Sequence, residues 1–114
     1  MQEKKVKKEN FYNLHAEMCK TIANPRRQAI LDTIRNGEMT VSELIKKTGI
    51  RQANLSQHLA ILRSKGVVST RRDGNNVHYS LSNLKIIEAY DLISEVLEDS
   101  ATSRDKTIRE GIGK

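Results

Sequence analysis

The chain has 114 residues, which suits one small domain, and it is poor in aromatic residues, with one Phe, three Tyr and no Trp. Its formal net charge of +6 favours a polyanionic partner such as DNA, RNA or an anionic membrane surface. A charged N-terminus, the lack of a long apolar run and a single cysteine argue against a secretory signal, a membrane span and an intrachain disulfide. We therefore expect a cytoplasmic protein without a membrane partner.

The charges are distributed unevenly along the chain. Residues 44–72 carry seven basic side chains and no acidic one, whereas residues 84–99 carry five acidic side chains and one basic one. One part of the molecule is therefore predicted to be basic and another acidic.

The first third of the chain predicts an arm and two helices. Residues 1–9 are predicted to form a flexible basic arm, and the apolar spacing over 10–22 predicts a first amphipathic helix. A second helix is expected over 25–36, because Asn24 can cap it and Pro25 suits its first position.

The middle of the chain predicts two short helices and a hairpin. The capping-box sequence from Thr40 to Glu43 predicts a third helix that starts near 41, and a fourth is expected over 52–65. Two extended runs between 67 and 81, joined at Asp73-Gly74, predict a β-hairpin.

A last helix is predicted over 83–99, followed by a polar tail at 100–114. The fold class is therefore mainly α with a β-hairpin wing, in the order α-α-α-α-β-β-α. We interpret residues 10–99 as one winged helix-turn-helix domain with a first and a last helix that dimerise.

The predicted fourth helix has an unusual outward face. Leu55, Leu59 and Leu62 share its core side, while the opposite side of its first two turns carries short uncharged residues. Such side chains can read base edges in a major groove, although they can also simply cover an exposed helix. The candidate residues of this face are Gln52, Ala53, Asn54, Ser56 and Gln57.

Basic and amide side chains surround this face. They lie on the two short helices and on the predicted wing, where they suit contacts with phosphates and flanking DNA. These candidates are Lys46, Lys47, Arg51, Arg63, Arg71, Arg72, Asn75 and Asn76.

Residues 23–82 resemble the ArsR/SmtB family of winged-helix transcriptional repressors in the order and spacing of their motifs. The resemblance is carried by LSQHLAILRSKGVV, with Ser56, His58, Leu59, Leu62 and Gly66, and by the wing DGNNVHYSL, with Tyr79. It implies a homodimer, joined through the first and last helices, that binds an inverted repeat and releases it when an effector, commonly a metal, binds. It also implies DNA contacts by the outward face of the fourth helix and by His58. For His58, packing or a hydrogen bond within the protein is the alternative. Tyr79 is expected to be structural.

The chain departs from the metal-sensing pattern of that family. Thr40-Val41-Ser42 stands where the family has a Cys-x-Cys motif, and no histidine follows His78. No cofactor is evident, and a metal effector is not expected. One remaining pair, His15 and Cys19, lies at helical spacing and offers two ligands, although a packing role is the alternative.

A broad apolar stripe on the last helix favours a dimer over packing on its own domain alone. The predicted interface consists of Phe11, Leu14, Met18, Ile86, Tyr90, Ile93 and Leu97; Leu84, Ile87 and Val96 widen the stripe.

The sequence thus predicts a homodimeric, sequence-specific regulator of double-stranded DNA that acts as a repressor, with helix 52–65 in the major groove and wing 71–78 on flanking DNA. The alternative is a winged-helix protein–protein interaction module. An enzyme is not expected, because no nucleophile–base arrangement, phosphate loop or metal cluster is evident.

Overall fold

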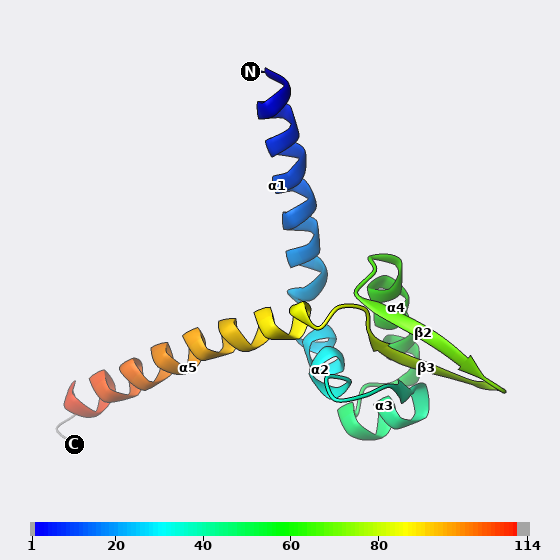
Figure 1. The fold of residues 1–114 in the computed structure, drawn as a ribbon. Helices are drawn as coiled ribbons and strands as arrows, with labels where there is room; N and C mark the ends of the chain where they lie inside the picture. Colours follow the sequence, from blue (N-terminus) through cyan, green and yellow to red (C-terminus); the bar gives the residue numbers. More distant parts are fainter. Residues whose placement is uncertain (1, 112–114) are drawn as a thin grey trace. The chain divides into compact units, whose positions relative to one another are not determined.

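The computed structural model describes the backbone of residues 2–111 and the side chains of residues 7–101 (Figure 1). Residues 1–83 form one compact unit and residues 84–114 form a second. The first unit contains α1 (Gln2–Ile22), α2 (Pro25–Thr33), β1 (Met39–Thr40), α3 (Val41–Thr48), α4 (Gln52–Ser64), β2 (Val68–Asp73) and β3 (Asn76–Leu81), and the second contains α5 (Lys85–Gly111).

The predicted fold class is confirmed, with one additional strand. β1 pairs with β3 through Met39 opposite Tyr79 and Thr40 opposite His78, which gives an antiparallel sheet in the order β1-β3-β2. The predicted order omitted β1 because a strand of two residues is too short to show an alternating pattern. This strand attaches the wing to the segment that precedes α3.

The core of the first unit is aliphatic and lies where α2, α3, α4 and β2 meet. The side chains that form this core come from α2 and its C-cap, from α3, from α4, and from the start of β2 and the residue before it, and at most 2% of their surface is exposed. These core residues are Ile30, Leu31, Ile34, Leu44, Leu55, Leu59, Leu62, Val67 and Val68.

Local signals start α2 and end α3 at the predicted places. Asn24 Oδ1 accepts hydrogen bonds from the backbone N–H groups of Arg26 and Arg27 at 3.0 and 3.2 Å. Gly49 follows α3 with φ of 72°, a left-handed conformation that glycine adopts without steric cost. α2 itself ends at Thr33, three residues before the predicted end, because residues 34–36 form a turn.

The capping box of α3 is formed as predicted. Thr40 Oγ1 accepts a hydrogen bond from the Glu43 N–H at 3.2 Å, and the Glu43 carboxylate accepts one from the Thr40 N–H at 3.0 Å. The backbone hydrogen bond from Thr40 lowers the pKa of Glu43 below its usual value of 4.5. This contribution to stability is therefore complete above pH 4.5 and is lost as the pH falls through the lowered pKa.

Replacing Thr40 by alanine should lower the free energy of unfolding by about 1 kcal/mol, because the Glu43 N–H loses its acceptor at the start of α3. Urea denaturation at pH 7 measures the change. Ser42→Ala, an exposed substitution two residues further along, is the control and should have little effect. Equal losses in the two variants would contradict a stabilising role for the cap.

The hairpin turn is formed by Gly74 and Asn75, because Asp73 and Asn76 face each other across β2 and β3. Gly74 has a φ of 61° and occupies the first position of the turn, as glycine does in a type II′ turn. The predicted wing is therefore confirmed in both strands and in its turn.

Both terminal segments are more helical than predicted. The expected flexible arm at 1–9 belongs to α1 from Gln2 onwards, and the expected tail at 100–114 belongs to α5 as far as Gly111. Residue 1 and residues 112–114 lie outside the described residues. Apolar periodicity did not reveal these turns because they are polar. Their Lys, Glu, Gln and Arg residues nevertheless favour helix, and neither Pro nor Gly interrupts them before Gly111.

Candidate nucleic-acid interface

The two faces of α4 differ sharply in burial. Leu55, Leu59 and Leu62 are at most 1% exposed and hold the helix on the core. The predicted readers on the other side lie at the surface: Gln52, Ala53, Ser56 and Gln57 are exposed, and Asn54 is half-buried. The inward leucines thus fix the helix while its short polar side chains remain available to a ligand.

α3 and α4 are joined by a tight turn at Gly49, Ile50 and Arg51. Ile50 is 8% exposed and anchors the turn, while Arg51 occupies the N-cap position of α4 without a side-chain capping bond. The N-terminus of α4, with its partial positive charge, therefore lies beside an exposed guanidinium and the outward residues. This arrangement favours an anionic surface such as the edge of a DNA groove.

The cations predicted to surround α4 are exposed. Within the described part of the chain, no ion pair engages Lys46, Lys47, Arg51 or Arg63, so their charges are available to phosphates. Arg26, an exposed residue at the start of α2, was not among the predicted contacts. Arg26 lines a surface hollow together with Arg51 and Asn54. Its position directly after Pro25, in the first turn of a helix, was the signal that could have indicated it.

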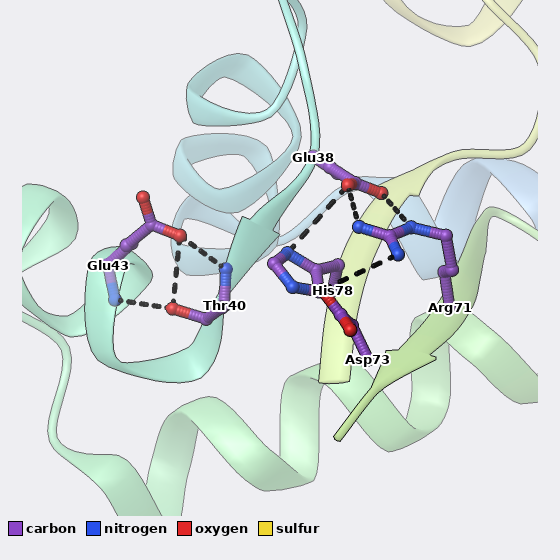
Figure 2. A network of polar contacts seen from close by, with 6 residues as sticks. All are labelled: Glu38, Thr40, Glu43, Arg71, Asp73 and His78. Carbon is purple, nitrogen blue, oxygen red and sulfur yellow. Dashed lines mark hydrogen bonds and ion pairs between the residues drawn. The ribbon is translucent and has the colours of Figure 1, made fainter. Parts of the chain in front are cut away.

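The wing divides its predicted residues into two groups. Arg72, Asn75 and Asn76 are exposed near the turn, as expected. Arg71, in contrast, forms a salt bridge with Glu38, the residue just before β1 (Figure 2). The contact spans 33 residues of sequence and was invisible to sequence analysis because β1 itself was not predicted.

His58 is half-buried, and its ring is hydrogen-bonded within the protein. Its Nδ1 accepts a hydrogen bond from Arg27 Nε at 3.2 Å, and Arg27 also donates to the Thr21 carbonyl at 3.1 Å. Burial, followed by the positive charges of Arg27 and Arg26, lowers the pKa of His58. This geometry is that of a neutral histidine linking α4 to α2, the alternative that the sequence left open.

His15 and Cys19 are close to each other in α1. Cys19 Sγ lies 3.6 Å from His15 Nδ1, and both residues are exposed. The described residues contain no group of three or more His, Cys, Asp or Glu side chains arranged to hold a metal ion. The pair alone provides two ligands, fewer than the four of a structural zinc site.

Two helices expose large apolar side chains. In α1, Phe11 and Leu14 are 61% and 66% exposed; in α5, Ile93 and Leu97 are 63% and 60% exposed. The other predicted interface residues, Met18, Ile86 and Tyr90, are half-buried. Leu84, Leu92 and Val96 are also exposed by more than 60%, whereas Ile87, expected to widen the stripe, is 7% exposed.

A helix-turn-helix with an exposed polar face, followed by a β-hairpin, defines the winged helix-turn-helix class of proteins. Residues 24–70 match the family described as bacterial regulatory protein, arsR family. The chain belongs to the arsR family, and it is a DNA-binding transcriptional regulator.

Individual relatives agree with this assignment. The crystal structure of Rv0081 from Mycobacterium tuberculosis is 39% identical, with a TM-score of 0.75 over 82% of this chain and 95% of that one. The biofilm growth-associated repressor of Agrobacterium fabrum is 43% identical over 65% of this chain and 66% of its own length. The homodimeric winged helix-turn-helix DNA-binding domain of Mb0332 from Mycobacterium bovis is 29% identical, with a TM-score of 0.74 over 82% and 87% of the two chains.

Across the part of the chain that the structure describes, no helix combines the length and the apolar character needed to span a membrane.

Proposed function

We propose that the protein binds an inverted repeat in double-stranded DNA as a homodimer and represses transcription there. The observation that carries the proposal is the division of α4 into a buried leucine face and an exposed face of amide, hydroxyl and methyl groups. A protein-binding module would not need the exposed basic side chains that surround this face of α4.

α4 is proposed to lie in the major groove. Gln52, Asn54 and Gln57 carry amides that can pair with adenine, Ser56 can donate or accept a hydrogen bond, and Ala53 can contact a thymine methyl group. None of these side chains carries a negative charge that would repel phosphate.

A separate group of cations is proposed to contact the DNA backbone. These residues are exposed and lie on α2, α3, α4 and the wing, around the base-reading face. The group consists of Arg26, Lys46, Lys47, Arg51, Arg63 and Arg72, with Asn75 and Asn76 at the wing tip. We leave His58 out of the contact set because its ring is directed to Arg27.

The dimer is proposed to form through the exposed apolar residues of α1 and α5. Leaving four α5 side chains, Leu92, Ile93, Val96 and Leu97, at least 60% exposed is unfavourable for a free protomer in water. A two-fold dimer would place two α4 helices about one turn of DNA apart, about 34 Å, and would thus match an inverted repeat.

A bacterial DNA-binding regulator acts where the chromosome lies, and we propose the cytoplasm as its location. We propose no enzymatic activity. The protein is proposed to act on transcription by occupying its operator.

Selection of bound sequences from a pool of random duplex DNA tests the proposal. Enrichment of an inverted repeat with half-sites about one helical turn apart would support it. Repeating the selection with zinc and other divalent metals tests whether a metal affects binding. Failure to enrich any sequence, with similar weak binding to all duplexes, would overturn the assignment as a sequence-specific regulator. Placing the selected repeat across a promoter then distinguishes repression from activation.

Replacing Gln57 by alanine should cost about 1–3 kcal/mol of binding free energy at the selected operator, because hydrogen bonds to a base edge are removed. Base preference at one position of each half-site should relax at the same time. Fluorescence anisotropy with operator and random duplexes measures both effects. Arg72→Ala is the matched control, since removing a phosphate-binding side chain should weaken both duplexes alike and reduce the salt dependence. Gln57 is not a base reader if its substitution weakens both duplexes equally.

A further inference from the structure

Arg71 and Arg72 are neighbours in β2, but they lie on opposite faces of the wing. Successive side chains of a strand alternate between faces, so Arg72 shares a face with Thr70 and with the buried Val68. Arg71 stands opposite His78, on the other face. The two arginines therefore meet different surroundings, although sequence analysis treated them as equivalent.

The face of Arg71 holds a compact charge network (Figure 2). The Arg71 guanidinium donates through Nε to Glu38 Oε2 at 3.2 Å and through Nη2 to Glu38 Oε1, a two-bond arrangement. Asp73 Oδ2 lies 4.0 Å from Arg71 Nη1, and His78 Nδ1 lies 3.8 Å from the Glu38 carboxylate. The hydrogen bond from Arg71 lowers the pKa of Glu38, so that this carboxylate, already ionised at neutral pH, stays ionised to a lower pH.

Resting on the proposed function, we propose that Glu38 is a positioning residue that withholds Arg71 from the DNA backbone. The wing then contributes Arg72, and not Arg71, to phosphate binding. The negative charge of Glu38 stays beside Arg71, so a phosphate that approached this arginine would meet a carboxylate as well.

The geometry explains why Glu38 can have this effect although the pair is exposed. Isolated surface ion pairs contribute little to stability, but planar two-bond contacts between arginine and a carboxylate are the most specific of them. Glu38 directly precedes β1, which is paired with β3, so its backbone is anchored in the same sheet as Arg71. The pairing therefore links β2 to the residue just before β1, while Arg72, exposed on the other face of β2, takes no part in it.

Four variants test the proposal by the salt dependence of binding to a random duplex: Arg71→Ala, Arg72→Ala, Glu38→Gln and the double variant E38Q/R71A. The slope of log affinity against log salt changes by about 0.9 for each DNA phosphate that a cationic side chain neutralises. Arg71→Ala should leave the slope of the unmutated protein unchanged, and Arg72→Ala should flatten it by about 0.9. Glu38→Gln should free Arg71 from its charged two-bond partner and leave only the more distant Asp73 carboxylate, at 4.0 Å, beside it. The slope should then steepen by up to about 0.9, and the affinity should rise about threefold to tenfold at low salt.

The double variant separates release of Arg71 from simple removal of a negative charge. If Glu38 acts through Arg71, adding Arg71→Ala to Glu38→Gln should abolish the increase in affinity and restore the original slope. An increase in affinity that persists in the double variant overturns the proposal. So does a loss of affinity in Glu38→Gln, and so does a slope for Arg71→Ala that is as flat as the slope for Arg72→Ala. If the unmutated protein binds no duplex at all, the proposed function fails and this inference fails with it; the other outcomes contradict the inference alone.

Discussion

Replacing Ile93 and Leu97 together by glutamine is expected to convert the proposed dimer into monomers and to lower affinity for an inverted repeat by about 100-fold or more. Each protomer would then hold one half-site, and the advantage of binding both half-sites at once, typically about 100-fold to 10,000-fold, would be lost. Both side chains are at least 60% exposed in the protomer, so the substitution should leave the fold of the monomer intact.

The measurement combines molar mass in solution with anisotropy on a full operator and on a single half-site. Affinity for the half-site should change little, because α4 is untouched. Glu95→Gln together with Glu98→Gln is the matched control on the same helix, and this variant should remain dimeric. If the variant with glutamine at both positions 93 and 97 keeps the dimeric mass, the apolar residues of α5 do not hold the dimer together.

Replacing Leu59 by alanine is expected to lower the free energy of unfolding by about 2–5 kcal/mol. Leu59 is 1% exposed and lies between Leu55 and Leu62 on the face of α4 that packs on the core. The loss combines the transfer free energy of the removed methyl groups with the cost of the cavity that remains. Against a typical domain stability of about 5–15 kcal/mol, this loss is large.

Urea denaturation at one fixed protein concentration measures the effect, because the stability of a dimer depends on concentration. Ile61→Ala provides a control in the same helix. Ile61 is 37% exposed, and its substitution should cost clearly less than that of Leu59. Similar losses at the two positions would mean that α4 is not anchored by its leucine face.

Sequence patterns predicted the helix-turn-helix and the wing well because each had a local chemical cause. The Thr40–Glu43 capping box, the left-handed Gly49 and the Gly74 turn all act within four residues of sequence, and all are formed. Periodicity failed where it had nothing to detect: β1 has two residues, and the added turns of α1 and α5 are polar.

In the candidate site too, features with a local cause were predictable from the sequence, and contacts between distant segments were not. The exposure of Ser56 and Gln57 followed from their positions relative to the leucines, which a helical wheel supplies. The pairing of Arg71 with Glu38 and of His58 with Arg27 depends on contacts across 33 and 31 residues of chain. The predicted wing suggested a DNA contact at Arg71, and the family resemblance suggested one at His58. Neither could show which polar groups the fold itself would occupy.

The division of α4 also has an evolutionary consequence. Since its three leucines support the domain from one side, the residues on the other side are free to change without a penalty in folding. Descendants of this chain could therefore acquire new target sequences through a few substitutions at positions 52, 53, 54, 56 and 57, while the architecture that presents them stays the same.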